Sequence, residues 1–403
     1  MRFEVFIALR YLKEGKAQTA LVLGGTTVGV AVLIFLTALI GGLQRTLVAQ
    51  TLSAQAHVLV KAPQRVARPL PASGAVADRV EKVPDRIRSI EQWQQVLDAL
   101  ATIPGVVAAT PTAAGSAFAI RGPATKSVAL RGIDPATFSQ VIEIVPKMQS
   151  GRFAMEGTET IIGTVLASDL GVEVGDKIRL ATPEGRGDVF TIAGIFDLGN
   201  KDVNQRWVFV PLRSAQTLLD IPGGATTIEV KVAEIFQAER LAREIQRRHG
   251  LSADSWMELN QQLLVGLRSQ SASSWMIQTL VVLAVALGIA SVLGVSVIQK
   301  SREIGILKAT GTSTRMVQRI FLLEGAIVGA VGSVLGALMG SAMAVAFASL
   351  ARGPTGAPLF PVDLSAGLFL GAATVAILTG TLAAWFPASR AARLDPAEVI
   401  RYG

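Results

Sequence analysis

The sequence predicts a membrane protein with four transmembrane helices, one followed by three, and a large α+β domain inserted between the first and the second. Half of the 403 residues are apolar and only 17% are charged, against about 25% in soluble domains. Four stretches lack Asp, Glu, Lys and Arg, and each exceeds the roughly 20 residues that cross a hydrocarbon core. The remaining residues form one continuous polar insert, which is large enough to have its own core.

The charge distribution predicts the orientation of these helices. The short segments 1–16, 300–324 and 389–403 together hold twelve basic residues and six acidic ones. Because basic residues stay on the cytoplasmic side of a membrane, we expect these segments to be cytoplasmic and the large domain to lie outside. No basic patch is left to bind nucleic acid. The predicted spans are 17–44, 273–299, 325–351 and 364–388, and the large domain with its stalks is 45–272.

Short apolar runs in the insert predict strands that alternate with helices. Residues 46–55 are expected to continue the first helix, and 62–88 to form a Pro- and Arg-rich excursion. Residues 256–271 are expected to be a helical stalk that runs without a breaker into the second span. Predicted helices are 89–103, 233–249, VLASDL and LRSAQTLLD, and predicted strands are HVLVK, SAFAI, SVALRG, ETIIG, KIRLAT, DVFTIAGIF, RWVFV and TTIEVKV.

Glycines recur at four-residue spacing in the first span and every three or four residues in the third. Such spacing permits close approach of two helix backbones. The alternative is that they reflect the general abundance of Gly in membrane helices. The candidate packing glycines are Gly25, Gly29, Gly325, Gly329, Gly332, Gly336 and Gly340.

The chain lacks the residue patterns of common catalytic and metal sites. It has no cysteine, which excludes disulfides, iron–sulfur clusters and thiol catalysis. The only Gly-Lys pair, Gly15-Lys16, has Arg10 where a P-loop needs its first Gly. His57 and His249 stand alone, without partners that would make them catalysts or ligands. We therefore expect no catalytic residue, metal or cofactor in this chain.

The most informative stretch is the basic segment between the second and third spans. It begins SREIGILKATG, places apolar Ile304 and Leu307 three residues apart, and ends at Gly311, a residue type typical of helix ends. Such a short amphipathic helix either lies in the membrane interface or docks into a groove on a partner. Glu324, at the start of the third span, is either a functional ionisable residue or a snorkelling, Arg-paired structural one.

Several stretches resemble one family. SREIGILKATGTSTRMVQRIFLLEGAIVGAVGSVLGALMG resembles the coupling region and third helix of MacB-type (type VII) ABC transporter permeases, a family that includes LolC, LolE and FtsX. The closing FPASRAARLDPAEVIRYG and the opening FIALRYLKEGKAQTALVLGGTTVGVAV resemble the two ends of the same permeases. Inside the insert, TIIGTVLASDLGVEVGDKIRL, FVPLRSAQTLL and SWMELNQQLL resemble the LolC and LolE lipoprotein-releasing branch of these FtsX-like permeases.

The resemblance implies a permease subunit of the bacterial inner membrane with a periplasmic large domain. It implies two copies of a separate ABC ATPase that binds ATP and Mg, a second permease copy or a paralogue, and a periplasmic carrier or adaptor. It further implies mechanotransmission, in which ATP-driven motion passes outward along the helices. The implied ATPase-coupling residues are Arg302, Glu303, Ile304, Gly305, Leu307, Lys308 and Gly311, and the C-terminal cytoplasmic motif is Pro387, Arg390, Asp395 and Pro396.

The substrate implied by the resemblance is a lipoprotein or another lipid-like, amphipathic molecule. Two alternatives stay open: a MacB-like efflux permease for small amphiphiles or peptides, and an FtsX-like regulator of a periplasmic cell-wall hydrolase. Extracted lipid chains need apolar walls, so we expect them at the outer end of the first span and along the stalk before the second. The candidate substrate residues are Phe35, Leu36, Leu39, Ile40, Leu264, Leu267 and Met276.

Overall fold

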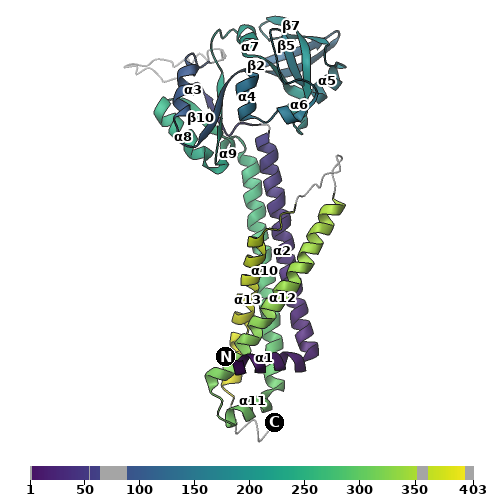
Figure 1. Ribbon diagram of the computed structural model, residues 1–403, viewed down its shortest axis with the longest axis vertical. Helices are drawn as coiled ribbons and strands as arrows, with labels where there is room; N and C mark the ends of the chain where they lie inside the picture. The colour runs from purple at the N-terminus through teal and green to yellow at the C-terminus, as the bar shows by residue number, and fades with distance from the viewer. Residues whose placement is uncertain (1, 54, 64–88, 352–361, 395–403) are drawn as a thin grey trace, which may run out of the picture. The chain divides into compact units, whose positions relative to one another are not determined.

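The computed structural model describes residues 2–53, 55–63, 89–351 and 362–394. These residues form two compact units (Figure 1). The helical unit comprises residues 1–47 and 265–403, and the core domain comprises residues 48–264. Almost all of the predicted Pro- and Arg-rich excursion, 62–88, lies outside the described residues.

Four helical spans in the described part of the chain are long and apolar enough to cross a membrane, as predicted. The first helix continues past its predicted span through residues 46–53, as expected. Two short helices complete the unit, α1 (Arg2–Glu14) and α11 (Ser301–Ala309). The spans are α2 (Lys16–Ser53), α10 (Gln261–Gln299), α12 (Thr314–Leu350) and α13 (Ala366–Ala383) followed by α14 (Trp385–Ala392).

Two helices that the sequence predicts as continuous are interrupted. The fourth span breaks after Ala383, because Pro387 has no N–H to donate to the Ala383 carbonyl. The stalk breaks at Asn260, whose φ of −118° and ψ of 38° separate α9 (Trp256–Leu259) from α10. The side-chain Nδ2 of Asn260 donates a hydrogen bond to the Trp256 carbonyl at 2.7 Å. Local side-chain bonds of this kind compete with helix geometry. The prediction of a stalk without a breaker is therefore wrong.

Six strands of the core domain close into a barrel. The circuit of pairings runs β2, β3, β8, β5, β7, β6 and back to β2, with β3–β8 and β5–β7 parallel and the other pairs antiparallel. Closure of this kind leaves no open sheet edge within the circuit. The strands are β2 (Val106–Arg121), β3 (Ala124–Ile133), β5 (Glu159–Gly163), β6 (Lys177–Ala181), β7 (Gly187–Phe196) and β8 (Trp207–Pro211).

Several barrel strands are buried on both faces, since successive side chains point to opposite sides of a sheet. Ile162 and Val208 belong to one apolar core, together with residues of α5 (Thr164–Leu170) and α7 (Leu212–Leu218). Their neighbours Ile161 and Phe209 belong to a second core with α4 (Pro135–Val141). This double burial explains why neighbouring residues are apolar without alternation at Ile161-Ile162 in β5 and from Trp207 to Val210 in β8.

The sheet extends from β2 through three further strands. β9 (Thr227–Val232) pairs with β2, β1 (Val58–Lys61) with β9, and β10 (Ser252–Ser255) with β1, all antiparallel. α3 (Trp93–Ala101) and α8 (Ala238–His249) share a third apolar core with these strands, centred on the fully buried Trp256. The remaining strand, β4 (Met148–Gly151), pairs with β7, and α6 (Lys201–Arg206) precedes β8.

All eight predicted strands are confirmed. The sequence did not predict β4, β10, α4, α6 or the first half of β2, where small and polar residues hide the alternation. The predicted helix 233–249 begins only at Ala238, after a 3-10 turn at Ile235–Gln237. The predicted helix 89–103 is shorter as well, since α3 covers Trp93–Ala101.

Candidate coupling surface and helix interfaces

The short helix α11 is set between two long helices by sharp turns at both ends. Gly311 follows it with a φ of +100°, a left-handed conformation that disfavours any other residue. Ser313 then caps α12 by accepting a hydrogen bond from the Met316 amide at 3.3 Å. The structure thus forms the helix between the second and third spans that SREIGILKATG predicts.

The inner face of α11 is part of the core of the helical unit. Ile304 is 1% exposed and packs in a cluster with Ala8, Val317 and Phe321, and Gly305 is buried beside it. Because both residues are buried within this chain, they offer no exposed surface to a partner, and their part in ATPase coupling stays a prediction. The pattern of two apolar residues three apart identifies one helical face but does not say whether that face turns inward or outward.

The outer face of α11 consists of residues that recur at three- and four-residue spacing. Ile306 is 51% exposed, and the sequence prediction had missed it. Leu307 is half-buried at the edge of this face, and Gly311 is exposed beyond the end of the helix. A side chain four positions from the exposed Arg302 lies on the same face, and that spacing could have identified Ile306. The exposed outer face is Arg302, Glu303, Ile306, Ala309 and Thr310.

Two lysines hold α11 to its neighbours instead of projecting outward. The Lys308 ammonium donates to the carbonyl oxygens of Ala392 at 3.1 Å and Leu394 at 2.5 Å, which satisfies groups at the end of α14. Lys300, directly before α11, donates to the Tyr11 carbonyl at 3.1 Å. Burial lowers the pKa of Lys300, against the attraction of Glu324, Glu303 and Glu14.

The C-terminal motif divides into a buried and an exposed part. Pro387 is buried, and Ala388 and Ala391 of the same helix pack into the core that holds Ile304. Arg390 is exposed. Asp395 and Pro396 lie outside the described residues. α14 therefore supports α11 from within the unit.

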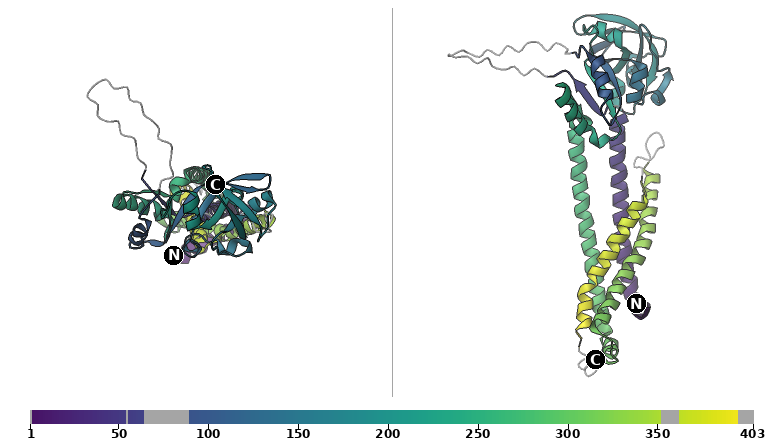
Figure 2. Two further views of the ribbon diagram at one scale, coloured as in Figure 1. Left: turned by 90° about the horizontal axis from the view of Figure 1, so that it is seen from above. Right: turned by 60° about the vertical axis from the view of Figure 1, so that its left-hand side comes forward.

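The helix α12 runs beside other long helices of the unit (Figure 2), and its glycine stripe contacts two of them, α13 and α2. A Cβ added to Gly329 would lie 2.6 Å from the Ala376 carbonyl oxygen, and Gly325 faces Gly380 of the same helix, α13. Farther along, a Cβ on Gly332 or Gly336 would lie 2.6 Å from Thr26 or Val30 of α2. Gly340 likewise faces the backbone of Ala31, with the Ala31 oxygen 2.8 Å from the position of a Cβ. Only residues without a side chain allow this approach.

The first-span glycines differ from each other. Gly29 faces Val285 of α10 at close range, whereas a Cβ on Gly25 would meet no atom within 4 Å. Among the described residues, therefore, none packs closely against Gly25. Both glycines line a groove of about 460 Å³ between α2 and α10, whose other walls include Leu21, Val281 and Ile289.

The candidate substrate residues do not gather at one place. Phe35 packs edge to face against Phe347 of α12, with 6.0 Å between ring centroids, and Leu36, Leu39 and Ile40 are half-buried. Met276 is 63% exposed. Leu267 is half-buried, and Leu264 packs on the third core of the core domain. None of these seven residues lines the groove between α2 and α10.

Glu324 is buried within α12. It is 3% exposed, and its Oε2 has no hydrogen-bond partner in the part of the chain that the structure describes. The same residues give it no ion pair within 4.0 Å, so the expected pairing with an arginine is absent there. A snorkelling position is wrong for a side chain this deeply buried.

Four membrane-spanning helices, an inserted core domain and a short exposed helix between the second and third spans define a permease-type membrane protein. Residues 19–248 match the family described as MacB-like periplasmic core domain, and residues 275–396 match the FtsX-like permease C-terminal family. The chain belongs to this family of ABC transporter permeases, which join a MacB-like core domain to an FtsX-like helical part.

Individual relatives cover the whole chain. It is 25% identical to the lipoprotein-releasing system transmembrane protein LolC of Neisseria meningitidis over 440 residues, with 99% of each chain covered. It is 24% identical to LolE of Haemophilus influenzae over 435 residues, again covering 99% of each. It is also 25% identical to the macrolide export ATP-binding/permease protein MacB of Azoarcus sp. over 98% of this chain and 58% of that protein.

Proposed function

We propose that this chain is the non-catalytic permease subunit of an ABC transporter. A separate ATPase, in two copies, binds ATP and Mg and docks on the outer face of α11, and a second permease copy or a paralogue completes the complex. The termini lie in the cytoplasm and the core domain lies outside the inner membrane. Nucleotide-driven motion of α11 then reaches the core domain through the long helices as a rigid-body movement.

The observation that carries this proposal is the contrast between the two faces of α11. Outside, Ile306 offers an exposed apolar anchor, and Arg302 and Glu303 lie beside it as a charged rim, the usual anatomy of a docking patch. On the inner face, Ile304 is buried in the core and Lys308 donates a hydrogen bond to the Leu394 carbonyl just beyond α14. A helix that is exposed on one face and packed into the core on the other can bind a partner and move with the rest of the unit as a rigid body.

The test replaces the anchor and measures binding of the ATPase subunit to the purified permease. Ile306→Asp should weaken association about 30-fold or more, because a charge would be buried in an apolar contact. Val107→Asp is the matched control, since Val107 is 60% exposed in the core domain, and it should leave association unchanged. Both variants should keep the unfolding temperature of the parent chain. If Ile306→Asp binds as tightly as the parent, the docking assignment is wrong.

We propose a lipid-like cargo, either a lipoprotein or another amphipathic molecule. The groove of about 460 Å³ between α2 and α10 has almost wholly apolar walls, which suit an acyl chain. Photo-crosslinking from Val28 in the groove and from Leu39 should capture acylated protein. Labelling by small amphiphiles alone would favour efflux, the second candidate, which the similarity to the macrolide exporter supports.

A further inference from the structure

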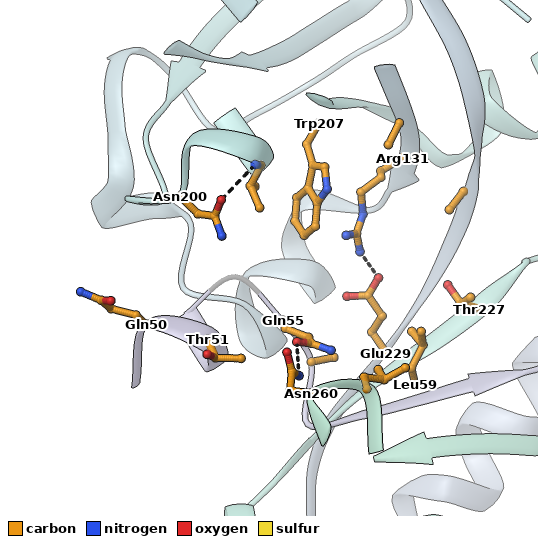
Figure 3. Close-up of a pocket in the computed structure, with 15 residues that line it drawn as sticks. Gln50, Thr51, Gln55, Leu59, Arg131, Asn200, Trp207, Thr227, Glu229 and Asn260 are labelled. Atoms are coloured by element: carbon orange, nitrogen blue, oxygen red, sulfur yellow. Dashed lines mark hydrogen bonds and ion pairs between the residues drawn. The ribbon is translucent and has the colours of Figure 1, made fainter. Parts of the chain in front are cut away.

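The core domain contains a cavity of about 460 Å³, with both polar and apolar walls, that the proposed coupling does not use (Figure 3). Its size lies within the range of ligand sites. Its walls come from the end of α2 and the segment after it, from β1, β2, β3, β8 and β9, from the start of α6, and from Leu259 and Asn260 at the break before α10. All of these residues belong to the core domain.

One wall holds a buried ion pair. Arg131 pairs with Glu229, and its guanidinium carbon lies 4.0 Å from the ring centroid of Trp207. Figure 3 shows the Arg131 and Trp207 side chains next to each other, with Glu229 below the guanidinium. Because the ion pair is neutral as a whole, this wall does not favour a charged ligand over an uncharged one. Arg131 Nε has no hydrogen-bond acceptor in the described residues, but the atom is itself buried and is not open to a ligand in the cavity.

The other walls present side-chain amides with unused groups. Asn200 Oδ1 accepts from the amides of Asp202 and Val203 at 3.0 and 3.4 Å, which leaves Nδ2 as a donor. Gln55 Oε1 accepts from Asn260 Nδ2 at 3.0 Å, which leaves the Gln55 nitrogen as a donor and the Asn260 oxygen as an acceptor. Within the described ranges, no hydrogen bond of the protein itself uses these three groups.

We propose that this cavity binds an extended, uncharged segment of a different protein through its main-chain amides. Peptide carbonyls match the unused donors of Asn200 and Gln55, and a peptide N–H matches the acceptor of Asn260. An anion is disfavoured because Glu229 already neutralises Arg131. A sugar is disfavoured because the guanidinium covers a face of Trp207, the aromatic platform on which a sugar ring would stack. The inference does not depend on the ATPase or on the lipid cargo.

Calorimetry on the full-length chain in detergent tests the proposal with three probes. They are a short acetylated and amidated peptide of Ser, Gly and Asn, a peptide of the same length rich in Glu, and a neutral glucose oligosaccharide. Only the neutral peptide should bind, and its affinity should be insensitive to salt, since no net charge is exchanged. Preference for the oligosaccharide or for the acidic peptide, or no binding of the neutral peptide, would overturn the proposal.

Two variants locate the binding. Asn200→Asp keeps the cap on α6, because Asp caps a helix as well as Asn does, but it loses the Nδ2 donor and should weaken binding about tenfold. Ala129→Leu fills the cavity from β3 and should abolish binding, whereas Ala136→Leu on the exposed surface of α4 should not change it. Full binding in both cavity variants would contradict the assignment. Dissociation of permease copies by the peptide would also contradict it, since the occupant would then be a second copy of this chain.

Discussion

Lys300 lies with its ammonium 3.8 Å from the ring centroid of Tyr11 while it donates a hydrogen bond to the carbonyl oxygen of the same residue. Its side chain is 11% exposed and lies 3.9 Å from the Glu14 carboxylate. A desolvated cation over an aromatic ring is held more tightly than an exposed one. The start of α11 is therefore anchored on α1, a helix from the other end of the sequence.

Loss of this anchor should loosen α11 without touching its outer face. Lys300→Met keeps the aliphatic stem but removes the cation and its hydrogen bond, so the unfolding free energy should fall by about 1–3 kcal/mol. The ATPase should still bind, but binding should no longer stimulate its turnover. Lys13→Met, at an exposed position of α1, is the control. Normal stimulation in Lys300→Met would show that the anchor has no part in coupling.

The Tyr11 phenol should titrate at unusually high pH. Burial and the nearby carboxylates of Glu303, Glu324 and Glu14 raise the pKa of Tyr11 from 10.0 to about 12. The folded state holds this proton more tightly than the unfolded state, so the associated stability is intact below pH 10 and is lost as the pH rises towards 12. The loss should be on the order of 2 kcal/mol.

The chain has only two tyrosines, which makes this measurement simple. In Tyr402→Phe, the ultraviolet absorbance titration reports Tyr11 alone and should have a midpoint near 12. Tyr11→Phe should remove the extra loss of stability between pH 10 and 12. An absorbance midpoint near 10 would mean that the ring is hydrated.

Substitution by Ala should lower the stability of the helical unit at one glycine of the spans but not at another. Gly329→Ala would place a methyl group 2.6 Å from the Ala376 carbonyl oxygen, so α12 and α13 must separate and the unfolding temperature should drop. Gly25→Ala meets no atom within 4 Å and should be neutral or stabilising by up to about 1 kcal/mol, because Ala favours helix. Thermal unfolding in detergent compares the two. Equal unfolding temperatures for both variants would contradict the interface described for Gly329.

The buried pair of Arg131 and Glu229 should show strong coupling. Glu229 is 2% exposed and also accepts from the Thr112 hydroxyl at 3.1 Å. Either Arg131→Met or Glu229→Met alone leaves a buried charge unpaired and should cost about 3–5 kcal/mol. The double variant should be more stable than either single one. Additive losses in denaturant unfolding would show instead that the two side chains act independently.

Sequence reasoning succeeded where one local property decides the structure. Four charge-free runs determine four spanning helices. The alternation in TTIEVKV or DVFTIAGIF determines strands, because the apolar positions of a strand show which of its faces is buried. It failed where the outcome depends on a distant partner. Whether Ile304 or Ile306 of α11 faces outward is decided by the cluster of α1, α12 and α14 that receives Ile304.

The same division holds for the whole protein. The sequence alone determined that this is a membrane protein, the number of its spans, the presence of an inserted α+β domain and the position of α11, since these follow from hydropathy, charge and short-range periodicity. Only the tertiary structure decided that six strands close into a barrel, that Gly329 packs closely whereas Gly25 does not, and that Arg131 meets Trp207 and Glu229. Each of these depends on contacts between residues far apart in the chain, and the spacing of residues within one segment does not say which partner that segment meets.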